Sequence, residues 1–197
     1  MAADSAVMVI DASKGVEAQT IKLFKVCVMR HIPIFTFINK LDREANDPFD
    51  LMDEIERVLG IKTCPINWPI GCGKNFKGVY DRNTNKITTF VAADAGMHEL
   101  DVEGAEDQVG IIGYQKLLED IELLDGACEE FDQDKVSNGE ISPVFFGSAL
   151  TNFGVETFLE HFLKMTTSPL PRHSSIGEIS PFDDNFSAFV FKIQANM

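Results

Sequence analysis

The stretch TFINKLDR, residues 36–43, ends an apolar run of β-type residues on the polar side chains Asn39, Lys40 and Asp42. A carboxylate at the mouth of a buried strand can accept two N–H bonds at once. Guanine presents such a pair on one edge, its N1–H and its 2-amino group. The spacing therefore suggests a guanine-reading loop. The alternative is a plain turn in which Asn39 and Asp42 cap the residues that follow.

A second stretch of small residues, GSAL at 147–150, also follows an apolar run. Small side chains allow the backbone to approach a ligand closely. The alternative is a strand that ends in small residues before a helix capped by Asn152. The order of the two stretches along the chain makes them candidates for one site.

The elements that would position these loops alternate in type. SAVMVIDA (5–12) and PIFTFI (33–38) are short apolar runs that predict buried strands. Amphipathic stretches follow both, and the second is expected to begin after an Asp47 N-cap and to end at Gly60. This β-α-β-α pattern predicts an α/β protein with a mostly parallel sheet flanked by helices.

Turn-forming residues become frequent from residue 63 onward. GVYD and KITTFV flank a DRNTNK turn, which predicts an antiparallel hairpin. Residues 104–125 predict an acidic amphipathic helix that Gly110 and Gly113 weaken, and ACEEFDQDKV predicts another helix. A strand at 142–150 and a helix in NFGVETFLEHFLKM then resume the parallel pattern. Between the two α/β parts we therefore expect an inserted α+β subdomain.

The expected division of the chain follows these changes of pattern. It is 1–62 for the central part of the α/β domain, 63–140 for the inserted subdomain, 141–167 for the C-terminal part of the domain, 168–185 for a linker, and 186–197 for the first strand of a second, β-barrel domain. Because a lone strand is not stable by itself, the sequence predicts a chain cut off within its next domain.

Composition excludes several classes of function. The net charge of −14 over 197 residues argues against binding DNA through a broad basic surface. No apolar run approaches the ~18 residues that span a bilayer, and no signal peptide is recognised, so we expect a cytoplasmic protein without a membrane partner. The four cysteines lack a CxxC pair or a ligand-like spacing to histidine, so no metal site is expected.

The NKLD and GSAL stretches together resemble the NKxD and SA[KL] motifs of GTP-binding proteins. The resemblance implies GTP or GDP as the ligand. The implied guanine contacts are Asn39, Lys40, Asp42, Ser148, Ala149 and Leu150. It also implies that the N–H of Ala149 bonds the guanine O6 while Ser148 steadies Asp42.

The long separation of the two motifs is similar to that in translational GTPases of the elongation factor G type, which carry an insertion there. WPIGCGKNFKGVYD (68–81) resembles the start of that insertion. Segments along nearly the whole chain, among them PIFTFINKLDRE and GEISPVFFGSALTNFGV, most resemble members that act in translation termination. The resemblance implies a partial P-loop GTPase domain. It also implies a role in which GTP hydrolysis on the ribosome recycles class-one release factors.

Several parts of such a GTPase are missing from the sequence. The P-loop motif GxxxxGK[ST] is absent, since Asn75 follows Gly73 and Lys74. The switch I threonine and the DTPGH segment are absent as well. We therefore expect no catalytic residue and no Mg²⁺ ligand in this chain, no GTPase activity by the chain alone and at most weak nucleotide affinity. The missing first strands also predict an exposed apolar face and self-association.

Two other functions remain open at this point. One is a non-enzymatic module that holds a protein partner through the acidic insertion. The other is a phosphoryl-transfer enzyme built on Asp11, although Ser13 stands where its second acid would be needed. Loss of GDP binding on substitution of Asp42 would separate the GTPase interpretation from the partner-binding module.

Overall fold

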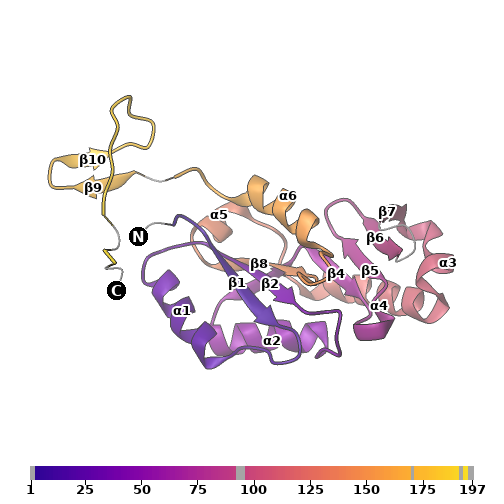
Figure 1. The fold of residues 1–197 in the computed structure, drawn as a ribbon. Helices are drawn as coiled ribbons and strands as arrows, with labels where there is room; N and C mark the ends of the chain where they lie inside the picture. Colours follow the sequence, from indigo (N-terminus) through magenta and orange to yellow (C-terminus); the bar gives the residue numbers. More distant parts are fainter. Residues whose placement is uncertain (1–2, 92–95, 170, 191–192, 195–197) are drawn as a thin grey trace.

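The computed structural model describes residues 3–91, 96–169, 171–190 and 193–194, and two four-stranded sheets form its body (Figure 1). The parallel sheet and the helices around it consist of β1 (Ala6–Asp11), α1 (Ala18–Val28), β2 (Ile34–Asn39), α2 (Pro48–Leu59), β3 (Lys62–Pro65), α5 (Gln133–Ser137), β8 (Ile141–Phe146) and α6 (Val155–Met165). The strand order is β1-β2-β8-β3 and every pair is parallel. The expected parallel α/β sheet is confirmed.

Helices cover both faces of this sheet because its strands alternate apolar side chains between two cores. Ile38 of β2 and Phe146 of β8 lie in the core that α1 and α2 complete. Phe37 and Phe145 lie in the other core, where both pack edge-on against Phe158 of α6 at ring-centroid distances of 5.3 and 5.0 Å. Such burial on both faces is typical of a central parallel strand.

Both ends of α2 follow the expected signals. Asp47 caps α2 by accepting the N–H of Phe49 at 2.9 Å. Gly60 ends that helix in the left-handed conformation at φ 74°. A non-glycine residue would be strained there, so Gly60 fixes where the chain turns into β3.

The second sheet is antiparallel and lies beside the first (Figure 1). Its strands are β4 (Asn67–Ile70), β5 (Gly78–Asp81), β6 (Lys86–Val91) and β7 (Gly96–Asp101), and a short 3₁₀ turn at Gly73–Asn75 separates the first two. The expected hairpin of GVYD and KITTFV is therefore confirmed as β5 and β6. Strand β3 still belongs to the parallel sheet, so the change of sheet falls between Pro65 and Asn67 rather than at residue 63.

The helices after this sheet differ from the expected ones. A 3₁₀ turn at Val102–Gly104 precedes α3 (Glu106–Val109) and α4 (Ile111–Ala127), which Gly110 separates at φ 87°. The single helix expected over 104–125 is therefore broken. The helix expected over ACEEFDQDKV is reduced to α5, because the Asp132 carboxylate accepts the N–H groups of Asp134 and Lys135 and starts the helix there.

The segment after α6 contains a small hairpin where a linker is expected. Its strands are β9 (Arg172–Ser174) and β10 (Gly177–Ile179), and Arg172 forms an ion pair with Asp4. The strand expected over 186–197 is not formed in 186–190 or 193–194, where no neighbouring strand pairs with the chain. The rest of that expected strand lies outside the described residues.

Within the part of the chain that the structure describes, none of the helices is both long enough and apolar enough to cross a membrane.

Candidate functional site

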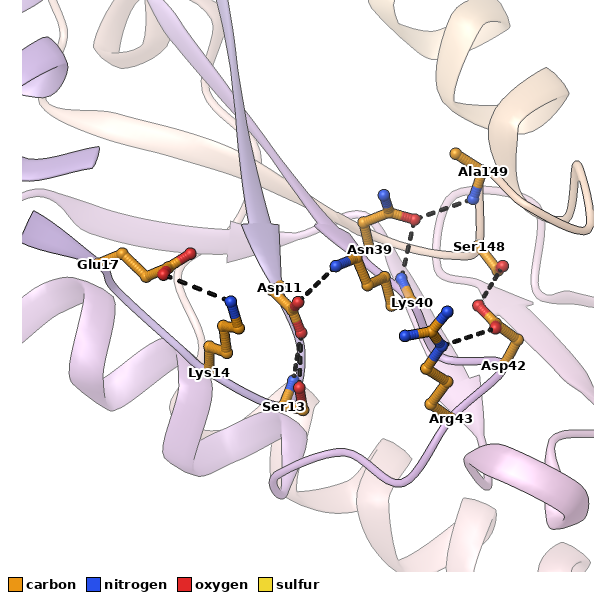
Figure 2. A network of polar contacts seen from close by, with 10 residues as sticks. All are labelled: Asp11, Ser13, Lys14, Glu17, Asn39, Lys40, Asp42, Arg43, Ser148 and Ala149. Carbon is orange, nitrogen blue, oxygen red and sulfur yellow. Dashed lines mark hydrogen bonds and ion pairs between the residues drawn. The ribbon is translucent and has the colours of Figure 1, made fainter. Parts of the chain in front are cut away.

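The two candidate loops lie next to each other at the carboxyl edge of the parallel sheet (Figure 2). Strand β2 pairs with β8 so that Ile38 stands opposite Phe146, and each strand runs directly into its loop. Strand β1 ends at the same edge, with Asp11 opposite Asn39. Ligands of doubly wound sheets bind outside this edge.

Asn39 ties the two loops together. Its Oδ1 accepts the backbone N–H of Lys40 at 2.8 Å and the backbone N–H of Ala149 at 2.9 Å. These two donors are 109 residues apart in the sequence, yet one amide oxygen holds both. The turn interpretation of Asn39 is thus incomplete, because the side chain also bridges to the other loop.

Asp42 is held by the second loop. The Ser148 hydroxyl donates to Asp42 Oδ1 at 2.5 Å, and Arg43 Nε lies 3.6 Å from Asp42 Oδ2 (Figure 2). The expected contact between Ser148 and Asp42 is therefore present. Ser148 therefore holds one oxygen of the carboxylate, and Arg43 lies near the other.

Lys40 points to a residue that was not among the expected guanine contacts. Its Nζ donates to Asp11 Oδ2 at 2.7 Å, and Ser13 donates to Asp11 Oδ1 from both its backbone N–H and its hydroxyl. The hydrogen bonds from Lys40 and Ser13 hold the pKa of the Asp11 carboxyl well below its usual range. The strand-end position of Asp11 was the sequence signal for this contact.

These contacts also bear on the phosphoryl-transfer interpretation. Both oxygens of Asp11 accept hydrogen bonds, and Ser13 is a donor to Asp11 rather than a second acid. Nowhere among the described residues do three His, Cys, Asp or Glu side chains gather so that they could hold a metal ion. The arrangement supports a positioning role for Asp11.

The second loop needs glycine at its first position. A Cβ on Gly147 would lie 2.5 Å from the carbonyl oxygen of Phe153 and 2.9 Å from the ring of Phe37. The loop then closes on itself, since Ser148 and Phe153 exchange two backbone hydrogen bonds of 2.9 Å. Leu150 is 77% exposed at the tip, so the loop presents backbone and small side chains next to Asp42.

The segment Gly73–Asn75 is not a phosphate-binding loop. It forms a short turn between two antiparallel strands, whereas a P-loop connects a strand to a helix. The N–H of Gly73 donates to the carbonyl oxygen of Leu41 at 2.8 Å, so this segment lies against the NKLD loop. The backbone N–H of Ala149 and the carboxylate of Asp42 thus lie at one edge of the sheet, the first as a hydrogen-bond donor and the second as an acceptor.

Comparison with known proteins agrees with this geometry. Residues 1–168 match the family model of the elongation factor Tu GTP binding domain. Over its whole length the chain is 57% identical to peptide chain release factor 3 of Symbiobacterium thermophilum and 52% identical to that of Limosilactobacillus reuteri. The chain spans 38% and 39% of the length of these two relatives.

A solved structure supports the fold alone. A crystal structure of a Thermus thermophilus protein covers 85% of this chain with a TM-score of 0.64, at 24% sequence identity and over 27% of its own length. The chain therefore belongs to the family of the elongation factor Tu GTP-binding domain, and along its whole length it is similar to peptide chain release factor 3.

Proposed function

We propose that this chain supplies the guanine-recognising part of the GTP site in a ribosome-dependent GTPase of translation termination. In this proposal the whole protein works in the cytoplasm and recycles class-one release factors. The names of the relatives and the match to a GTP-binding domain support it. The single observation that carries it is the hydrogen bond of 2.5 Å between Ser148 and Asp42, which joins two loops 106 residues apart.

Asp42 would read the base through its carboxylate. With Oδ1 held by Ser148, the group is oriented to accept the N1–H and the 2-amino group of guanine. Adenine has an acceptor at N1 and no 2-amino group, so it would offer the partly buried Asp42 carboxylate neither of the two N–H donors that guanine supplies. The penalty for a lost pair of this kind is about 1–3 kcal/mol.

Ala149 would read the opposite end of the same edge. Its N–H now donates to Asn39 Oδ1 and would instead be shared with the guanine O6. The exposed position of Ala149 leaves the backbone accessible. The Lys40 stem, anchored at its end by Asp11, would lie along the plane of the base, and Leu150 would border the loop from its exposed tip.

The experiment needs the rest of the GTP site. We would use a chimaera in which this chain replaces the matching segment of the Symbiobacterium thermophilum relative, and measure nucleotide affinity by isothermal titration calorimetry. Asp42→Ala is expected to weaken GDP binding by about 10- to 100-fold, because a bidentate pair is lost. Asp42→Asn is expected to shift the preference towards xanthosine diphosphate.

Asp50→Asn, an exposed change of the same kind on α2, is the matched control and should leave both affinities unchanged. If Asp42→Asn binds GDP and xanthosine diphosphate as the parent chimaera does, the guanine assignment is wrong.

The phosphates and Mg²⁺ would be bound by residues outside this chain. No P-loop motif occurs in the sequence, and phosphoryl transfer depends on such a loop, its lysine and the metal ion. We therefore expect the 197-residue chain alone to hydrolyse no GTP. Phosphate release above the background rate by the purified chain would contradict this.

The non-enzymatic alternative has one observation in its favour. The acidic helix α4 exposes four large apolar side chains, Ile111, Ile112, Leu118 and Leu123. A surface of this kind suits a protein partner. This alternative predicts no effect of Asp42→Ala on any function of the chimaera, so the same variant separates the two.

A further inference from the structure

Asn67, the first residue of the antiparallel sheet, makes an unusual contact with the parallel sheet. Its side chain is fully buried. Its Nδ2 donates to the carbonyl oxygen of Phe146 at 3.0 Å, and its Oδ1 accepts the N–H of Phe146 at 2.7 Å. One amide side chain thus satisfies both backbone groups of one residue of β8.

This contact replaces a missing strand neighbour. The ladder between β3 and β8 reaches Val144, and the N–H of Ile66 adds one more bond to the carbonyl oxygen of Val144 at 2.9 Å. The chain then leaves the parallel sheet to begin β4. Without Asn67, the polar backbone groups of Phe146 would be buried without a partner on that side.

The position of Phe146 determines where the GSAL loop (147–150) starts. Phe146 is followed directly by Gly147, which has no room for a Cβ, and then by Ser148, which holds Asp42. A displacement of the end of β8 therefore moves the hydroxyl that orients the Asp42 carboxylate.

The antiparallel sheet that Asn67 begins also supports the NKLD loop. The N–H of Gly73 donates to the carbonyl oxygen of Leu41 at 2.8 Å. The ring of Phe76 packs edge-on against Phe153, the residue that closes the second loop, at a centroid distance of 4.9 Å. Residues 67–76 therefore contact both loops.

We propose that Asn67 is a positioning residue for guanine selectivity, with Phe76 as a second support. Through them the inserted antiparallel unit sets the geometry of the base-reading loops. This inference rests on the proposed function. It goes further because it assigns guanine selectivity to residues that would not touch the base. Base preference can therefore be measured separately from stability.

The test compares GDP with inosine diphosphate, which lacks only the 2-amino group that Asp42 would read. In the chimaera, Asn67→Leu keeps the approximate volume and removes both hydrogen bonds to Phe146. We expect the preference for GDP over inosine diphosphate to fall about tenfold. Phe76→Leu, which keeps every hydrogen bond, should lower the preference about two- to threefold. Calorimetry gives both dissociation constants, and circular dichroism gives the melting temperature.

Two controls separate a positioning role from a loss of stability. Ile87 is a buried residue of β6 that pairs with Tyr80 of β5 and Leu100 of β7. Ile87→Ala opens a cavity there, so it should lower the melting temperature while keeping the preference for GDP over inosine diphosphate. Phe131→Leu is the matched control for Phe76→Leu and should leave the preference unchanged.

If Asn67→Leu and Ile87→Ala change the preference equally at equal loss of melting temperature, the proposal is wrong. If Asn67→Leu does not fold, Phe76→Leu is the deciding variant. An unchanged preference for GDP over inosine diphosphate in Phe76→Leu then overturns the proposal. An Asp42→Asn variant that alters base preference while both supporting variants leave it intact refutes only this inference. An Asp42→Asn variant without effect refutes the proposed function itself.

Discussion

The two edges of the parallel sheet are built very differently. At the β3 edge the chain covers its own strand, because it continues into β4 and buries Trp68 completely between the two sheets. At the β1 edge Val7 and Val9 are 41% and 56% exposed. Beside them, residues of β1 and α1 line a mostly apolar groove of about 500 Å³.

The difference shows which part of the sheet the chain can stabilise by itself. Apolar burial and satisfied backbone groups at the β3 edge need only residues of this chain. Among the described strands, β1 pairs only with β2. Its other side is the kind of surface that pairs with another strand. The candidate guanine loops follow β2 and β8, the two central strands.

The largest expected effect is at the covered edge. Trp68→Ala removes a fully buried ring that packs on Phe49 and Phe146 at centroid distances of 4.5 and 5.3 Å. The free energy of unfolding should fall by about 3–5 kcal/mol, as for other buried aromatic truncations. Urea denaturation measures it, with Val9→Ala at the open edge as the control. Equal losses for the two variants would remove the distinction between the edges.

A smaller effect is expected from a buried acid where the antiparallel sheet meets α6. His161 Nε2 lies 2.8 Å from Asp81 Oδ2. Burial by itself would raise the pKa of Asp81, but hydrogen bonds from His161 and from the backbone of Thr84 and Asn83 outweigh it, and the pKa is lowered.

A lowered folded-state pKa has a defined consequence for stability. The stabilisation is complete above the ordinary value of 3.8 and is lost as the pH falls through the lower folded value. Asp81→Asn should cost about 2 kcal/mol at pH 7 and flatten the acid limb of a stability–pH curve. A curve for this variant with the parent slope below pH 4 would assign the acid sensitivity elsewhere.

At the open edge the expected effect is on association more than on stability. We propose that the exposed β1 edge causes this chain to self-associate. Val7→Lys together with Val9→Lys should shift sedimentation velocity profiles towards the monomer, because edge lysines oppose strand pairing. The free energy of unfolding should change by only about 0.5 kcal/mol. Profiles identical to those of the parent chain would place any association at another surface.

The smallest effect is expected from the ion pair that joins α2 to the first residue of β3. Lys62 Nζ lies 2.7 Å from Glu56 Oε2, and the Lys62 side chain is largely exposed. Lys62→Met should change the free energy of unfolding very little, since exposed ion pairs gain little. Glu56→Gln should cost more, because the same carboxylate accepts the N–H and hydroxyl of Thr63. Chemical denaturation of both variants ranks them.

Local sequence predicted the strands and loops of the candidate site well. Apolar runs predicted β1, β2 and β8, and the Asp47 and Gly60 signals predicted the ends of α2. Polar residues after β2 located the first loop, and small residues after β8 located the second. Each of these features depends on residues within a few positions of one another. The guanine contacts themselves remain predictions.

Features set by distant partners could not be predicted. Asn67 was not among the residues that the sequence singled out, because its partner Phe146 lies 79 positions away. The strand-end position of Asp11 could be read from the sequence, but its ion pair with Lys40 also needs β1 to lie next to β2. Near the C-terminus the local pattern predicted a strand that is not formed in 186–190 or 193–194. Alternation of apolar and polar residues does not form a strand without a neighbouring strand.

The complete burial of Trp68 has a practical consequence, because it is the only tryptophan in the sequence. The indole donates its N–H to Asp120 of α4 and packs against α2 and β8, so three segments of the chain meet around one chromophore. Intrinsic fluorescence should therefore be blue-shifted in the folded chain and should report separation of the two sheets. Fraying of the hairpin at 172–179 would leave the emission unchanged. Trp68 is thus an internal fluorescent probe of the contact between the two sheets, and no added label is needed to follow their separation.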